Sequence, residues 1–117
     1  MNLMAMHNIK VEYAVVMSYS FSNEWLALSH AQRRAFEEEH VFPVFAKYGD
    51  RIRRRSYDAD SFATRTSDFM ILETEDLQAY YFLVEELRDN PLLAKGYARI
   101  DDFMIGINNE YKQIPPI

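Results

Sequence analysis

The chain has 117 residues, of which 49% are hydrophobic and 26% are charged, and its net charge is −5. These proportions predict one globular domain, and the negative charge argues against a surface that binds nucleic acid. The chain has no cysteine, which excludes disulfides and thiolate metal sites. No apolar run approaches the length of a membrane span. We therefore expect a single cytoplasmic domain over residues 1–117, with tails at 1–9 and 107–117.

The first half of the chain predicts a strand followed by a long helix. Residues 10–21 are rich in β-branched and aromatic side chains and are apolar on both faces, which is typical of a central strand. Ser29 and Gln32 form a capping-box pattern that marks the start of the helix. Pro43 is expected to kink this helix, and Gly49 to end it.

The second half predicts two strands, a second helix and a last strand. Residues 51–57 alternate as a short strand, and residues 67–74 have the apolar character of a central strand. Thr74 is expected to cap the second helix, which the Asn90–Pro91 pair stops. The last strand is expected over 97–107.

This order of elements, βαββαβ, is the ferredoxin-like arrangement, an α+β fold. It predicts a four-stranded antiparallel sheet with both helices on one face, so that the other face is uncovered. Because the central strands are apolar on both faces, we expect a homodimer that packs sheet to sheet. The alternative is a monomer in which the tail of residues 111–117 folds across the sheet.

An unusually basic stretch, residues 51–73, contains five arginines and three aspartates. Arg51, Arg53 and Arg54 lie on the second predicted strand, which is an edge strand in this fold. Charged side chains on edge strands protect a sheet from edge-to-edge association. These three arginines are therefore interpreted as solvated edge charge.

Arg55 and Arg65 flank the turn DADSFAT and can converge where the two strands meet. Asp58 and Asp68 each lie three residues further on, and two Arg–Asp pairs would satisfy one another without a ligand. In the functional interpretation, one guanidinium stays free to bind a carboxylate, enolate or phenolate. Asp68 is then the best candidate for a carboxylate base.

Two further side chains allow both a structural and a functional interpretation. His40 lies on the apolar side of the first helix, as a core residue or as a group that moves a proton. Pro43 would free the carbonyl of Glu39 for a neighbouring group. Trp25 either stacks on a flat ligand or closes the core as a hydrophobic plug.

Three segments resemble the darcynin family of small bacterial proteins: EWLALSHAQRRAF at 24–36, RSYDADSFATRTSD at 55–68 and ETEDLQAYYFLVEELRD at 73–89. The most specific part is R-x-x-D followed by R-x-S-D, which falls on Arg55, Asp58, Arg65, Ser67 and Asp68. The resemblance extends from residue 13 to about residue 90. More distantly, the layout is similar to dimeric α/β-barrel proteins, a group that includes cofactor-free monooxygenases, cyclases and muconolactone isomerases.

Together these observations predict a small-molecule enzyme without a bound cofactor, of the isomerase, cyclase or oxygenase type. Its substrate would be flat, aromatic or polyketide-like, with an anionic oxygen. The catalytic candidates are His40, Arg55 and Asp68, and the substrate-binding candidates are Trp25, Tyr57, Arg65 and Phe69. No spacing of His, Asp or Glu predicts a metal site. The alternative is a non-catalytic dimeric module, either structural or binding a small molecule.

Overall fold

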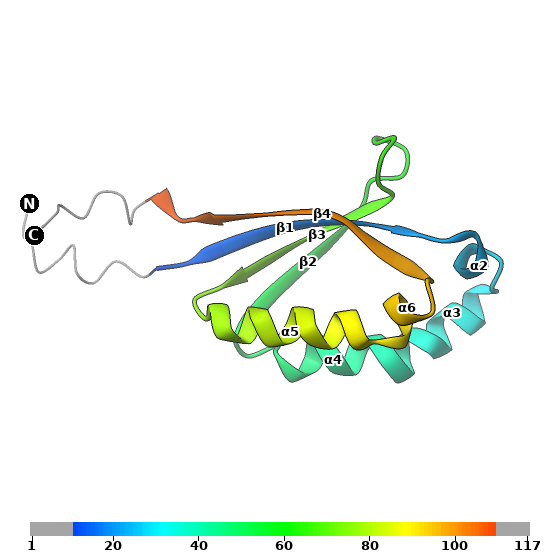
Figure 1. Cartoon of the computed structure of the whole chain (residues 1–117), viewed down its shortest axis with the longest axis horizontal. Coiled ribbons are helices and arrows are strands. Elements are labelled where there is room, and N and C mark those ends of the chain that lie inside the picture. The colour runs from blue at the N-terminus through cyan, green and yellow to red at the C-terminus, as the bar shows by residue number, and fades with distance from the viewer. Residues whose placement is uncertain (1–10, 110–117) are drawn as a thin grey trace, which may run out of the picture.

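The computed structural model describes residues 11–109 and shows the expected four-stranded antiparallel sheet (Figure 1). Its strand order is β2-β3-β1-β4, so β1 and β3 are central and β2 and β4 form the edges. The strands are β1 (Tyr13–Phe21), β2 (Ile52–Asp58), β3 (Asp68–Thr74) and β4 (Ala98–Ile107). The βαββαβ order is confirmed, and the fold is α+β and ferredoxin-like.

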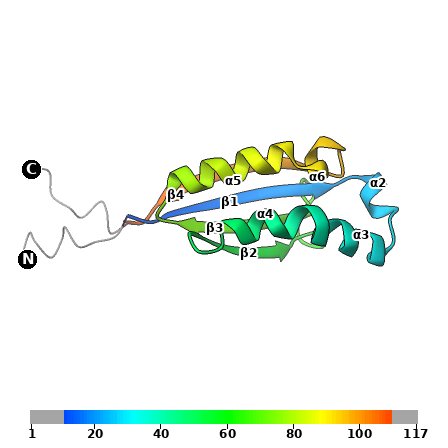
Figure 2. The ribbon, with the colours of Figure 1, turned by 90° about the horizontal axis from the view of Figure 1, so that it is seen from below.

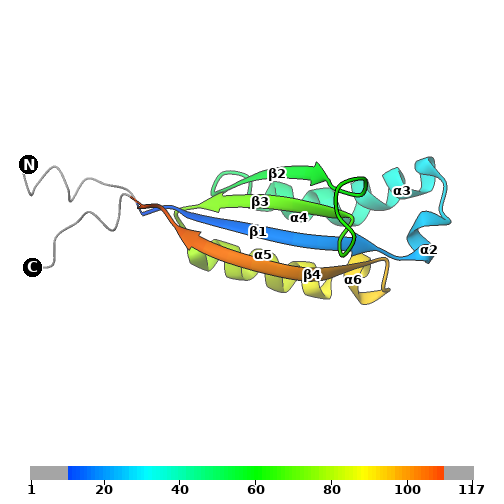
Figure 3. The same cartoon turned by 90° about the horizontal axis from the view of Figure 1, so that it is seen from above.

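All helices lie on one face of the sheet, and Figure 2, seen from that side, shows α4 and α5 side by side in front of it. One helical run is formed by α3 (His30–Phe36), the π-helical turn η1 (Glu37–Val41) and α4 (Phe42–Lys47), and the second long helix is α5 (Leu77–Asp89). Two short helices, α2 (Asn23–Leu26) and α6 (Pro91–Ala94), precede α3 and β4. We call the other side of the sheet, which no helix covers in Figure 3, the open face.

The core lies between the sheet and the helices. Val15 and Leu72 from the central strands and Leu83 from α5 are fully buried there, and Met17 is nearly so. Because successive side chains of a strand point to opposite faces, Val16 must lie on the open face. The β2 residue that contributes to the core is Ile52, which is 6% exposed.

Polar side chains cap the N-termini of both long helices. The capping box is confirmed: Ser29 accepts a hydrogen bond from the Gln32 backbone, and the Gln32 side chain accepts one from the Ser29 backbone. The second long helix begins later than expected, because Asp76 rather than Thr74 is its N-cap. Asp76 accepts a hydrogen bond from the N–H of Ala79, whereas the Thr74 hydroxyl donates to the carbonyl of Arg51.

Near Pro43 the helix contains a π-helical turn in place of a simple kink. The N–H of Phe42 donates to the carbonyl of Glu37, five residues back, so one extra residue is accommodated before the proline. The carbonyl of His40, not that of Glu39 as predicted, accepts a side-chain hydrogen bond. Its donor is Nδ2 of Asn90, at 2.6 Å. Asn90 is buried and also caps α6, so it ties this turn to the start of α6.

Within residues 11–109, no helix is long and apolar enough to cross a membrane. Ile107 belongs to β4 rather than to a tail. Apart from Asn108 and Asn109, the other expected tail residues lie outside the described part of the chain. The same holds for residues 111–117, which were the alternative to a second subunit as a cover for the sheet.

Candidate functional site

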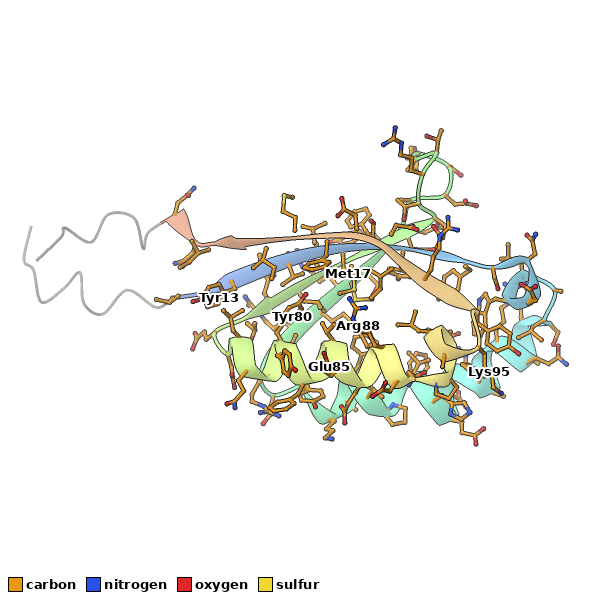
Figure 4. All side chains as sticks on the ribbon, in the orientation of Figure 1. Tyr13, Met17, Tyr80, Glu85, Arg88 and Lys95 are labelled. Carbon is orange, nitrogen blue, oxygen red and sulfur yellow. The ribbon has the colours of Figure 1, made fainter. Side chains whose placement is uncertain are left out.

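A mainly apolar cavity of about 100 Å³ lies between the sheet and the helices. Its walls come from all four strands and the helical layer, and Met17, labelled in Figure 4, points from β1 toward the helices. Cavities that bind drug-sized ligands usually have about 300–1,000 Å³, whereas an apolar cavity of about 150 Å³ holds benzene. The space is smaller than both, so it can enclose at most one ring of a ligand.

Tyr19 brings a hydroxyl into this apolar lining. It lies on β1 opposite Asp68 of β3 and Ile100 of β4. Burial raises the pKa of the Tyr19 hydroxyl, and the negative charge of Asp68 raises it further, against the opposing effects of Ser56 and Arg54. Tyr19 is therefore held in its neutral form, in which its O–H can donate a hydrogen bond.

Arg54 places a positive charge in the wall of the cavity. It points toward the helices because it shares a strand face with the buried Ile52. Its guanidinium lies over the Phe45 ring, 4.2 Å from the ring centre, and its Nη1 donates to Oγ of Ser56 at 3.1 Å. Arg54 forms no ion pair with any carboxylate of residues 11–109. Its charge is therefore available to an anionic ligand.

The only carboxylate among the described residues of the cavity lining is that of Glu37, the first residue of the π-helical turn. Val41, at the other end of the turn, is also part of the wall. Such turns occur frequently at functional sites. Here the turn contributes both an acidic and an apolar side chain to the same cavity.

The predicted cluster of Arg55, Arg65 and Asp68 does not form. Arg55 lies on the open face, where its Nη2 donates to Oε1 of Glu73 at 3.0 Å. Asp68 points to the helix side and accepts a hydrogen bond from Oγ of Ser67 at 2.7 Å. Arg65 lies in the exposed loop between β2 and β3 and lines a shallow outer cleft together with Asp68. Strand alternation separates Arg55 from Asp68, because the two side chains are on opposite faces of the sheet.

The other candidate residues are also distributed over different sites. Trp25 is 4% exposed and lines the cavity, but it is also packed among three rings, with Phe21 stacked on it at 5.4 Å. His40 packs on the Phe36 ring, with 4.7 Å between ring centres, and is not part of the cavity lining. Tyr57 and Phe69 stack on each other, 5.0 Å apart, and belong to the side of the sheet that carries Arg55. Trp25 is therefore the one predicted site residue that lines the cavity.

Sequence reasoning missed Tyr19, Arg54 and Glu37. A signal for Arg54 was present: Ile52 is the one aliphatic residue of the segment 51–57, so its face had to turn toward the core and take Arg54 with it. Nothing in the sequence distinguished Glu37 from the two glutamates that follow it.

Asp68→Asn is expected to lower the pKa of Tyr19, since the Asp68 charge is one of the causes that raise it. The titration of Tyr19 can be followed by NMR with ring-labelled tyrosine, and Tyr19→Phe assigns the signal. Asp102→Asn is the matched control, because Asp102 does not contribute to the Tyr19 shift. A Tyr19 pKa that stays the same or rises in Asp68→Asn would contradict this electrostatic coupling.

A family model described as "Darcynin, domain of unknown function" matches residues 2–114. The chain belongs to the darcynin family. It is 34% identical over 70 residues to a darcynin of Chromobacterium violaceum, covering 60% of this chain and 87% of that protein. It is 31% identical over 86 residues to darcynin 1 of Acinetobacter baumannii, covering 74% and 94%.

Solved structures with the same fold include a haem-binding protein from Thermus thermophilus. Its TM-score is 0.75 at 19% identity, over 87% of this chain and 42% of that one. A chlorite dismutase from Candidatus Nitrospira defluvii has a TM-score of 0.71 at 12% identity, over 84% of this chain and 40% of that one. The darcynin chain thus spans less than half the length of these proteins, and at such identities the likeness shows the fold alone.

The cavity does not fit a haem. Neither His30 nor His40 lines it, and its volume of about 100 Å³ is below that of ordinary drug-sized sites. Within residues 11–109 there is also no group of three or more His, Cys, Asp or Glu side chains placed to hold a metal ion.

Proposed function

We propose that this darcynin binds a small, flat, mainly apolar molecule with one anionic oxygen in the cavity between its sheet and its helices, and catalyses a proton transfer on it. The observation that carries the proposal is the Arg54 guanidinium, which has no carboxylate partner among the described residues and stands in an otherwise mainly apolar wall. Glu37 lines the same cavity but forms no ion pair with Arg54, so the guanidinium can still pair with a ligand that brings a negative charge.

Tyr19 and Arg54 would act together on the ligand's oxygen. A neutral tyrosine donates one hydrogen bond, and the guanidinium offers donors beyond the one that Ser56 accepts. Both groups are held by the sheet before a ligand arrives, Tyr19 on β1 and Arg54 on β2. Fixed donors aimed at an oxygen stabilise negative charge as it develops there.

Glu37 would be the base in this reaction. Its carboxylate takes a proton from the carbon beside a carbonyl group, and the electron pair of the broken C–H bond moves onto the carbonyl oxygen to give an enolate. Tyr19 and Arg54 stabilise that enolate, and return of the proton to a different atom completes an isomerisation. The reaction needs a base and groups that stabilise the negative charge of the enolate. Glu37, Tyr19 and Arg54, which all line the cavity, would fill these roles.

The exchange of the α-protons of phenylpyruvate in D₂O, followed by proton NMR, tests this function. We expect the protein to accelerate the exchange and Glu37→Gln to slow it by about a hundred-fold or more, which is the usual contribution of a general base. Glu38→Gln, an exposed neighbour outside the cavity lining, is the matched control and should exchange at the wild-type rate.

Binding and turnover are separated by the fluorescence of Trp25, the single tryptophan and a residue of the cavity wall. If wild type and Glu37→Gln exchange the protons at the same rate while Trp25 fluorescence still responds to phenylpyruvate, the protein binds the molecule but does not catalyse the proton transfer. A Trp25 signal that does not respond would refute the site itself.

A further inference from the structure

Ser56 lies next to the two oxygen-binding groups of the cavity without being part of its wall. It follows Arg54 by two residues on β2, so both side chains point to the helix side of the sheet. Across β3, Ser56 pairs with Met70, which in turn pairs with Met17 of β1. Tyr19 is two residues after Met17, so its side chain is on the same face, one row further along.

The Ser56 side chain joins these two groups by hydrogen bonds. Its Oγ accepts from Nη1 of Arg54 at 3.1 Å, and it also forms a side-chain hydrogen bond with the Tyr19 hydroxyl. A serine hydroxyl accepts through its oxygen and has a single O–H to donate. Since the oxygen of Ser56 already takes the N–H of Arg54, its O–H is left for the oxygen of Tyr19. The hydrogen bonds thus run in one direction, from Arg54 through Ser56 to Tyr19.

The pKa of Tyr19 agrees with this direction. Burial is the largest cause that raises the pKa of the Tyr19 hydroxyl, and the carboxylates of Asp68 and Glu37 add to it. The hydrogen bond with Ser56 lowers this pKa, as does the positive charge of Arg54. A hydrogen bond lowers the pKa of a tyrosine when it stabilises the phenolate, which can only accept. Ser56 is therefore the donor in its contact with Tyr19.

We propose, on the basis of the function given above, that Ser56 is a positioning residue which links Arg54 and Tyr19 into one chain of hydrogen bonds and so restricts the ligand to an oxygen that only accepts them. Arg54 has donors and no acceptor, and the Tyr19 oxygen is already engaged by Ser56, so both groups donate to the ligand. A carboxylate or an enolate satisfies such a site. An amide or a protonated acid instead directs an N–H or O–H at groups that cannot accept it.

The place of this chain in the sheet fits a ligand with an apolar ring and a polar end. Arg54 and Ser56 are exposed on the edge strand β2, whereas Met17, in the wall of the cavity, is buried. The ring would enter the apolar part, with its oxygen at the exposed rim. Arg54 is held there from two sides, by the Phe45 ring and by Ser56, before a ligand arrives. Donors held in place in this way lose little freedom on binding.

Titration of Tyr19 by NMR without any ligand tests the chain of hydrogen bonds itself. Ser56→Ala is expected to raise the pKa of Tyr19, because the variant removes a hydrogen bond that lowers it. Ser56→Thr keeps the hydroxyl and should stay close to wild type. Ser18→Ala is the matched control, since it removes the same group from the open face of β1. An unchanged or lower Tyr19 pKa in Ser56→Ala would overturn the proposal.

Benzoate and benzamide test the selectivity, because they share a size and shape but differ in the group that faces the chain. Quenching of Trp25 fluorescence gives both dissociation constants. We expect Ser56→Ala to reduce the preference for benzoate by about ten-fold, as is usual when a hydrogen bond to a charged group is lost. Ser18→Ala should keep the preference. In a Tyr19→Phe background, Ser56→Ala should have little further effect on it, and losses that simply add would refute the link between the two residues.

The two measurements separate the role of Ser56 from the function on which it rests. If benzoate binds but Ser56→Ala changes neither the Tyr19 pKa nor the preference over benzamide, the role of Ser56 is refuted and the function stands. If benzoate does not bind, the selectivity is refuted together with the proposed function, and the titration of Tyr19 still decides whether the chain of hydrogen bonds exists.

Discussion

Alanine in place of Arg54 is expected to weaken the binding of benzoate by about ten-fold or more, which corresponds to about 1.4 kcal/mol. Benzoate combines one ring, the most that the cavity can enclose, with one anionic group that can pair with Arg54. Exposed ion pairs usually contribute up to about 1 kcal/mol, and removing one partner of a buried charge pair in an interface costs about 2–5 kcal/mol. Arg54 is exposed on one side but lies against the Phe45 ring, which favours a value between these ranges.

Quenching of Trp25 fluorescence measures this affinity directly, because Trp25 is the only tryptophan and lines the cavity. Arg34→Ala is the matched control, since it removes the same charge from an exposed position on α3, outside the cavity lining. Toluene, which has the ring but no charge, should bind Arg54→Ala and wild type alike. Equal losses of benzoate affinity in Arg34→Ala and Arg54→Ala would mean that only the net charge of the protein matters.

The arginines of β2 show what can and cannot be predicted from the sequence. Alternation alone divides the strand correctly into Arg53 and Arg55 on one face and Ile52 and Arg54 on the other. Assigning each set to a face requires the observation that Ile52 has to be buried. Without that step, Arg54 is interpreted as edge charge and Arg55 as a cavity residue, which reverses the positions found in the structure.

The fold itself was more predictable than the site because its signals are local. The capping box of Ser29 and Gln32 and the alternating apolar residues of the strands each act within a few residues. Pro43 predicted a disturbance of the helix, but not its π-helical form or the tertiary contact made there, the hydrogen bond from Asn90 to the carbonyl of His40 across 50 positions of sequence. Glu37 is the first of three consecutive glutamates, and the sequence alone does not show which of them lines the cavity.

Trp25→Ala is expected to have the largest effect on stability, a loss of about 3–5 kcal/mol, as is usual when a buried aromatic ring is removed. Trp25 belongs to the short helix α2 and is 4% exposed. Its ring stacks on Phe21 at the end of β1 and packs edge-on against Phe36 of α3. It also contacts Tyr97, which directly precedes β4. One side chain thus holds together the end of the sheet and the beginning of the helical layer.

Urea unfolding followed by circular dichroism measures this loss without depending on the tryptophan signal. Domains of this size are stable by about 5–15 kcal/mol, so the alanine variant is expected to be close to unfolding at room temperature. Trp25→Phe keeps a ring in the cluster and should lose less. The result also separates the two interpretations of this residue. A loss of at least about 3 kcal/mol makes Trp25 a structural plug whose edge forms part of the cavity wall. A loss below about 1 kcal/mol, together with lost benzoate binding measured by NMR, would instead show that the ring serves mainly to contact the ligand.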